Sequence, residues 1–134
     1  MPTAGIYNIL IVDDSVTTIT YLKFSFAKRL QFKLDTLNTA EDALVYLTTN
    51  TAPDLILLDI SLPYMNGIEL CKRLKDEYPS IPVLVMTAEL DPRERLNAYQ
   101  AGADDFIVKP GGIEEIVSRI KHHLHLTSLD NQGF

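Results

Sequence analysis

Residues 55–59 read Leu-Ile-Leu-Leu-Asp, four consecutive large apolar side chains followed directly by an acid. A short, continuous apolar run is typical of a strand that is buried on both faces of a parallel sheet. Because burying an unpaired carboxylate is costly, an acid at the end of such a strand needs a structural or chemical reason. The stretch therefore predicts a buried parallel strand that delivers Asp59 to one edge of a sheet.

The same arrangement, an apolar run followed by a polar residue, occurs at three other places in the chain. These runs end at Asp13-Asp14, at Thr87 and at Lys109. In open sheets that are covered by helices, the ligand crevice lies at the carboxyl ends of the strands. We therefore expect three acids, one hydroxyl group and one lysine to converge on one edge of the sheet.

Strand-like and helix-like segments alternate five times along the sequence. Repeated strand–helix units of this length imply right-handed crossovers onto a parallel sheet. The predicted fold class is therefore α/β, a doubly wound sandwich with helices on both faces. The expected strands are residues 7–12, 33–37, 55–59, 82–86 and 105–109, and the expected helices are about 15–30, a helix from 39, 67–78, 92–101 and 113–126.

Helical spacing predicts which side chains of these helices face the core. In the first helix the apolar residues recur at helical intervals, which predicts one buried stripe. Cys71 lies in the amphipathic pattern of the third helix and is expected to be a small buried residue rather than a reactive thiol. The stripe of the first helix consists of Val16, Ile19, Leu22, Phe26 and Leu30.

Bulk properties limit the classes of function. The chain has 134 residues and a net charge of −6, and it contains no internal repeat and no Ser/Gly-rich linker. We expect one domain over residues 1–126, with residues 127–134 as a tail or the start of a linker. An acidic chain repels the phosphate backbone, which argues against direct nucleic-acid binding. No apolar stretch approaches the ~20 residues of a membrane span, and a cytoplasmic location is expected.

The three acids at the expected edge suit a hard cation. Carboxylates at the ends of adjacent strands repel one another unless a cation or a proton compensates. Ligand sets made only of oxygen atoms favour Mg²⁺ or Mn²⁺. The alternative for Asp13-Asp14 is a cap for the helix that follows them, since acids are common there.

Asp59, Lys109 and Thr87 each have a functional and a structural interpretation. Asp59 could be a carboxylate nucleophile that forms an aspartyl-phosphate, or an acid that is satisfied by backbone amides of the next loop. Lys109 could balance carboxylate and phosphoryl oxygens, or could be an ordinary surface lysine with a buried stem. Thr87 could donate a hydroxyl hydrogen bond to a phosphoryl group, or simply be a residue that favours strands.

Three histidines near the end of the chain form a second candidate for metal binding. His122 and His125 are three residues apart on the last helix, and His123 lies between them. Metal sites usually need a third and a fourth ligand, which nothing nearby in the sequence supplies. A solvated helix end is the better interpretation.

Over about residues 6–126 the chain resembles the receiver domain of two-component response regulators, the CheY-like superfamily. Any one of the matching blocks is only suggestive, but all of them in this order and spacing are specific. The resemblance implies a five-stranded sheet in the order 2-1-3-4-5. The matching blocks are Ile9-Leu-Ile-Val-Asp-Asp-Ser15, Pro53-Asp-Leu-Ile-Leu-Leu-Asp-Ile-Ser-Leu-Pro-Tyr-Met-Asn-Gly67, Val85-Met-Thr-Ala88 and Gly102-Ala-Asp-Asp-Phe-Ile-Val-Lys-Pro110.

The resemblance also implies a phosphoryl-transfer site. Asp59 would accept a phosphoryl group from a sensor histidine kinase or a phosphotransfer protein, with Mg²⁺, or alternatively Mn²⁺, as cofactor. Asp13, Asp14 and Asp59 would hold the metal, together with the backbone carbonyl of Ser61. The domain would be a signalling switch that catalyses only its own phosphorylation and dephosphorylation, not an enzyme that acts on other substrates.

In the family that this chain resembles, phosphorylation is read at a distant face. Thr87 and Lys109 would bind the phosphoryl oxygens, and Phe106 would turn inward. These changes would reshape the face formed by the fourth helix, the fifth strand and the fifth helix, a population shift that an output domain or a downstream protein detects.

A homodimer that forms on phosphorylation is a further expectation from the resemblance. Related winged-helix regulators dimerise through ion pairs on that output face. Asn97 and Gln100 stand where charges are expected, so the match is incomplete. The residues that do match the set are Asp104, Asp105, Arg119 and Lys121.

Two other functions remain open on the sequence. A phosphatase with an aspartate nucleophile would act on small molecules, but such enzymes generally have a second acid two residues after the nucleophile, where this chain has Ser61. A degenerate receiver that works only as a binding module is the other alternative. The full set of acids, hydroxyl group and lysine argues against it.

Overall fold

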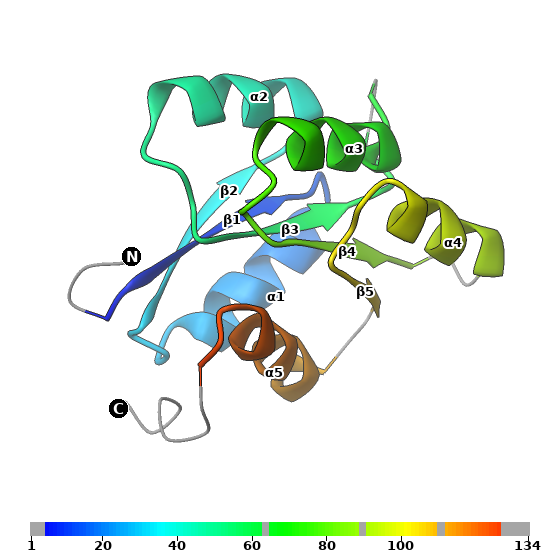
Figure 1. Cartoon of the computed structure of the whole chain (residues 1–134). Coiled ribbons are helices and arrows are strands. Elements are labelled where there is room, and N and C mark those ends of the chain that lie inside the picture. The colour runs from blue at the N-terminus through cyan, green and yellow to red at the C-terminus, as the bar shows by residue number, and fades with distance from the viewer. Residues whose placement is uncertain (1–4, 63–64, 89–90, 110–111, 127–134) are drawn as a thin grey trace.

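The computed structural model describes residues 5–62, 65–88, 91–109 and 112–126. In these residues five strands and five helices alternate along the chain (Figure 1). The expected tail, residues 127–134, lies outside the described residues. The elements are β1 Tyr7–Val12, α1 Val16–Phe26, β2 Phe32–Leu37, α2 Ala40–Thr49, β3 Leu55–Asp59, α3 Gly67–Glu77, β4 Val83–Thr87, α4 Pro92–Gln100, β5 Asp105–Val108 and α5 Ile113–His123.

The five strands form one parallel sheet in the order β2-β1-β3-β4-β5. The predicted fold class and strand order are therefore confirmed. Within the sheet Val12 is paired with Leu58, and Asp59 with Met86. Because the register keeps neighbouring strands level, the residues that follow β1, β3, β4 and β5 emerge at the same edge.

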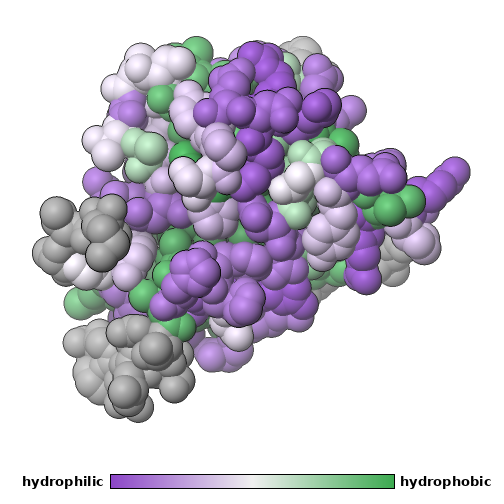
Figure 2. Space-filling model, viewed as in Figure 1, coloured by the Kyte–Doolittle hydropathy of each residue, from purple (hydrophilic) through white to green (hydrophobic). Residues whose placement is uncertain are grey.

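Helices cover both faces of the sheet. In Figure 1, α2, α3 and α4 lie on one face, and α1 and α5 lie on the other. Two separate clusters of buried side chains match these two layers. The apolar residues of β3 have no exposed surface, as a strand covered on both faces requires. Figure 2 shows that the outer surface over α3 and α5 is mostly hydrophilic, with only scattered hydrophobic residues.

The predicted inward stripe of the first helix is only partly right. Leu22 and Phe26 are buried, but Val16 is 77% exposed and Leu30 is 71% exposed. α1 ends at Phe26, four residues earlier than expected, so Leu30 falls in the turn before β2. Val16 is the first residue of the helix and lies beyond the part that packs on the sheet.

Helix ends follow the local chemistry of the sequence. The Thr39 hydroxyl accepts a hydrogen bond from the Asp42 amide at 3.0 Å and begins α2. Asp91 accepts from the Arg93 amide at 2.9 Å, with Pro92 at the first helical position of α4. Gly102, after α4, has φ of +100°, a conformation that favours glycine.

Cys71 is fully buried in the core, as predicted. Burial raises the pKa of its thiol to about 11. Because the thiolate is the reactive form, this cysteine behaves as an apolar core residue. Among the described residues, no helix has both the length and the apolar character needed to cross a membrane.

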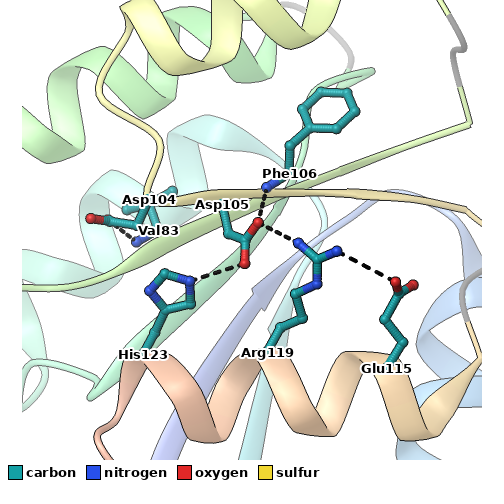
Figure 3. Close-up of polar contacts among 7 residues, drawn as sticks. All are labelled: Val83, Asp104, Asp105, Phe106, Glu115, Arg119 and His123. Carbon is teal, nitrogen blue, oxygen red and sulfur yellow. Dashed lines mark hydrogen bonds and ion pairs between the residues drawn. The ribbon is translucent and has the colours of Figure 1, made fainter.

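A polar network fastens α5 to the start of β5 (Figure 3). Asp105 accepts hydrogen bonds from Arg119 at 2.5 Å and from the Phe106 amide at 2.8 Å, and its other oxygen lies 3.0 Å from His123 Nε2. Burial would raise the pKa of Asp105, but the contacts with His123, the Phe106 amide and Arg119 outweigh it and lower the pKa. His123 is therefore not part of a solvated helix end, although His122 and His125 are exposed.

Gly67, the first residue of α3, sits directly against the loop that follows Asp59. A Cβ atom on Gly67 would lie 2.3 Å from the Ile60 Cα and 2.4 Å from the Asp59 carbonyl oxygen. The Gly67 amide also donates to the Ile60 carbonyl at 3.0 Å. Only glycine allows this close approach, which holds Asp59 and the following loop in place.

We predict that Gly67→Ala lowers the free energy of unfolding by roughly 1–3 kcal/mol, because the added methyl group must displace backbone atoms. Gly112→Ala is the matched control, since a Cβ atom there meets nothing within 4 Å. Urea denaturation of both variants measures the difference. Equal stability of Gly67→Ala and the wild type would show that the contact is not tight.

We also predict that Asp105→Asn lowers the free energy of unfolding at pH 7 by about 1–3 kcal/mol, the usual range for hydrogen bonds to a charged group. The pKa of Asp105 is lowered in the folded protein from its ordinary value of 3.8. Its contribution is therefore complete above that value and disappears as pH falls through the lower folded pKa.

The difference between Asp105→Asn and the wild type should thus be present at pH 5 and shrink as the pH falls below 3.8. Asp76→Asn is the control, because the Lys72–Asp76 pair is exposed and should contribute little. A cost for Asp105→Asn that persists unchanged into the acid range contradicts this explanation.

Candidate functional site

Four strand ends bring polar side chains to one edge of the sheet. Asp13 and Asp14 follow β1, Asp59 is the last residue of β3, and Lys109 follows β5. Carboxylate oxygens of the three acids all lie within 4.8 Å of one another. Asp13 and Asp59 are buried, whereas Asp14 is exposed. Two inner carboxylates and one outer one therefore form a group that is open to solvent on one side.

Lys109 bridges the two buried acids. Its ammonium nitrogen lies 2.7 Å from Asp13 Oδ2 and 3.3 Å from Asp59 Oδ2. The Lys109 backbone amide donates to the Thr87 carbonyl at 2.7 Å, which ties the end of β5 to the end of β4. The Lys109 side chain is only 16% exposed. It is therefore a counter-charge inside the site and not an ordinary surface lysine.

Backbone amides hold the other oxygen of each buried acid. The Ser15 amide donates to Asp13 Oδ1 at 2.8 Å, and the Ser61 amide donates to Asp59 Oδ1 at 2.9 Å. Each donor is two residues after its acid, the spacing of an Asx-turn. Both carboxylates are thus oriented by the loop that follows their own strand. For Asp13 the signal in the sequence is Ser15, two positions after the acid and directly before the first residue of α1.

The cap of α1 is Ser15, whose hydroxyl accepts from the Thr18 amide at 3.2 Å. The structural alternative for Asp13-Asp14, a helix cap, is therefore wrong. The structural alternative for Asp59 is present in part, since one of its oxygens does accept from a backbone amide. That bond leaves the other oxygen facing Lys109.

The charges in the group do not balance. Burial raises the pKa of Asp13, and the nearby charge of Asp59 adds to this, while hydrogen bonds from Lys109 and Ser15 oppose it. Three carboxylates face one ammonium, so the group has room for a further positive charge. The available donors are oxygens only, and one side is open, which fits Mg²⁺ with some of its waters retained. Asp13, Asp14 and Asp59 are the side chains that could hold it.

Two further residues of the predicted site are buried in the sheet, Thr87 in β4 and Phe106 in β5. Thr87 is completely buried at the end of β4, where it is paired with Val108 of β5. Phe106 is 5% exposed, so its ring is already turned into the protein. The Arg95 guanidinium of α4 lies 5.3 Å from the centre of that ring. The aromatic side chain thus links the β5 strand to α4.

The four residues of the expected output face lie near the opposite end of β5. Asp104 accepts from the Val83 amide at 2.8 Å and from Lys75 at 2.9 Å. Both carboxylate oxygens of Asp105 have partners, Arg119 at Oδ1 and His123 at Oδ2 (Figure 3). Lys121 is only 5% exposed. The structure therefore gives both acids partners within the chain.

Comparisons with known proteins agree with this geometry. The family model for the response regulator receiver domain matches residues 9–121. The response regulator MprA of Mycobacterium sp. (strain KMS) is 34% identical over 124 residues, which are 91% of this chain and 52% of that protein. The alkaline phosphatase synthesis transcriptional regulatory protein PhoP of Bacillus subtilis (strain 168) is 35% identical over 113 residues, 84% of this chain and 46% of PhoP. The chain thus spans about half the length of these curated relatives.

Solved structures support the same assignment. The BeF3-activated receiver domain of DrrB, from Thermotoga maritima, superposes with a TM-score of 0.79 at 28% identity, over 90% of this chain and 98% of that domain. The family model's match over residues 9–121 includes Asp13, Asp14, Asp59 and Lys109. This chain belongs to the response regulator receiver domain family of two-component signal transduction.

Proposed function

We propose that this domain is a phosphorylation-dependent switch in which Asp59 accepts a phosphoryl group from the phosphohistidine of a sensor histidine kinase or a phosphotransfer protein. The observation that carries the proposal is the group of three carboxylates within 4.8 Å of one another, with Lys109 bridging the two buried ones. A buried carboxylate beside further acids and a lysine ammonium suits phosphoryl transfer to a carboxylate.

Asp59 is the nucleophile because of its position. It is the last residue of the central strand β3, is 4% exposed, and has one oxygen fixed by the Ser61 amide. A carboxylate oxygen of Asp59 attacks phosphorus in line, the P–O bond forms, and the P–N bond to the donor imidazole breaks with its electron pair leaving on nitrogen. Asp59 then carries an acyl phosphate.

Mg²⁺ would neutralise negative charge on the carboxylates and the phosphoryl oxygens. Asp13, Asp14 and Asp59 are the side chains proposed to hold it, with the backbone carbonyl of Ser61. Asp14, which is exposed, is the acid with most freedom to meet an incoming ion. Mn²⁺, with similar ligand preferences, is an expected substitute.

Lys109 and Thr87 are proposed to bind the phosphoryl group. Lys109 contacts Asp59 before transfer, so its ammonium is in place to contact oxygens attached to the same carboxylate afterwards. Thr87 ends the strand next to β3 and would supply a hydroxyl donor. Positioning and charge neutralisation, rather than covalent work by other residues, would account for the rate.

The output is proposed to lie on the face formed by α4, β5 and α5. Phosphorylation adds about −1.5 to −2 charges next to Lys109 and Thr87. Phe106 and Arg95 connect that edge to α4, and Asp105 connects β5 to α5. An output domain or a downstream protein would detect the altered face. A homodimer would use the output face only after the two acids exchange their contacts within the chain for contacts with the second copy. The residues concerned are Asp104, Asp105, Arg119 and Lys121.

We predict that acetyl phosphate with Mg²⁺ adds one phosphoryl group to the protein, detected by intact mass under conditions that preserve acyl phosphates. Asp59→Asn should abolish the adduct because the nucleophile is lost. Asp76→Asn, an exposed acid on α3, should leave it unchanged. An unmodified wild-type mass, or a full adduct on Asp59→Asn, would overturn the assignment.

We further predict that Asp14→Ala raises the Mg²⁺ concentration needed for half-maximal phosphorylation on the order of 10-fold or more, by analogy with losses in other metal sites. Because Asp14 is exposed, the variant should unfold at nearly the wild-type urea concentration. Excess EDTA should stop the reaction in the wild type. An identical Mg²⁺ dependence in both proteins would remove Asp14 from the metal site.

A further inference from the structure

A mostly apolar cleft of about 450 Å³ lies beside the phosphorylation site, between α1, α5 and the sheet. Its inner walls are Leu22, Met86, Ile107 and Ile116, each at most 3% exposed. Small-molecule sites commonly have volumes of roughly 300–1,000 Å³ and walls of this apolar kind. Lys109 lines one side of the cleft. The other described lining residues have no role in the phosphoryl transfer proposed above.

A glycine lines the cleft where α5 begins. Gly112, immediately before α5, lines it, and a Cβ atom there would meet nothing within 4 Å. Its backbone has φ of −67° and ψ of 147°, a conformation open to any residue. A larger residue at position 112 could therefore occupy the cleft without backbone strain, whereas glycine leaves it open.

Charge limits what the cleft can hold. Among the described residues that line the cleft, Lys109 is the single charged side chain, and its ammonium group is directed to Asp13 and Asp59. The adjacent group of three carboxylates repels anions. Cations would lose hydration against apolar walls and gain no partner there. Thr17, Thr18 and Tyr21, whose side chains carry neutral hydroxyl groups, also line the cleft, so an uncharged molecule fits best.

We propose that this cleft binds a neutral, mostly apolar small molecule of up to about the size of a fused two-ring aromatic compound, carrying one hydroxyl or carbonyl group. For scale, an apolar cavity of about 150 Å³ is enough to bind benzene. The walls would provide the apolar contact, and the threonine and tyrosine hydroxyls at the mouth would fix the polar group.

The bound molecule would also regulate the switch, an effect that rests on the proposed phosphorylation of Asp59. Met86 immediately precedes Thr87, and Ile107 is two residues before Lys109. A molecule packed against the Lys109 stem would hold its ammonium on Asp13 and Asp59, where it competes with the metal ion for carboxylate oxygens and is kept from shifting onto the phosphoryl oxygens. Occupancy should therefore slow phosphorylation, and by linkage Mg²⁺ bound at the carboxylates should weaken binding of the molecule.

The test uses two probes with the same ring system, 2-naphthol, which is neutral at pH 7, and 2-naphthoate, which is an anion. Amide chemical shifts of the whole chain are followed by NMR as each probe is added. We expect saturable shifts from 2-naphthol at Leu22, Ile107, Gly112 and Ile116, and none from 2-naphthoate. The rate of phosphorylation by acetyl phosphate should fall on the order of fivefold at saturation.

Two variants at one position provide the control. Gly112→Leu should fill the cleft, abolish the shifts caused by 2-naphthol and make the phosphorylation rate insensitive to the probe. Gly112→Ser adds only a small side chain and should bind as the wild type does. No saturable binding of 2-naphthol, equal binding of 2-naphthoate, or unchanged binding to Gly112→Leu would each overturn the binding site.

Binding in the cleft and its effect on phosphorylation can be disproved independently. Saturable binding with an unchanged phosphorylation rate would overturn the regulatory effect and leave the cleft as a binding site. Absence of any phosphorylation would overturn the function proposed for Asp59, while the shifts measured in the unphosphorylated protein would still decide whether the cleft binds its ligand.

Discussion

The contact of Lys109 with the carboxylates at the carboxyl edge of the sheet is the interaction on which the rest of the site depends. Lys109 contacts both Asp13 and Asp59 at hydrogen-bonding distance, yet one ammonium cannot neutralise three carboxylates. Burial of Asp13 makes this imbalance more costly and raises its pKa. The folded protein therefore maintains a small region of unfavourable negative charge. In the proposed function a divalent cation would relieve it, and the same region would be the place where a phosphoryl group is accepted.

The parallel sheet makes this arrangement possible, because the acids and the lysine are separated by most of the chain. Asp13 and Lys109 are 96 positions apart, and only the level register of β1, β3, β4 and β5 brings them together. Gly67 keeps the loop after Asp59 in close contact with α3. The network around Asp105 fixes α5 against β5 at the other end of the sheet. In the proposed function, changes at the phosphorylation edge would be transmitted along β5 to the α4–β5–α5 face.

Much of the fold and the site could be predicted from local sequence, because each strand is a short apolar run with a polar residue at its end. β1 and β3 were predicted with their observed bounds, and Asp59 and Lys109 were selected because each follows such a run. Periodicity failed at Val16 and Leu30, since it does not reveal where a helix extends beyond the sheet. The pairing of His123 with Asp105, and the cleft beside Gly112, depend on how α5 packs on the sheet. Neither has a signal in the local sequence.

A Mg²⁺ titration of the free energy of unfolding at constant ionic strength shows whether the acidic group binds a cation. An ion that binds only the folded state stabilises it by RT ln(1 + [Mg²⁺]/Kd). The wild type should become more stable with this concentration dependence, and a variant carrying both Asp13→Asn and Asp59→Asn should not respond. A wild-type stability that is independent of Mg²⁺, or an equal response in the double variant, would contradict the account.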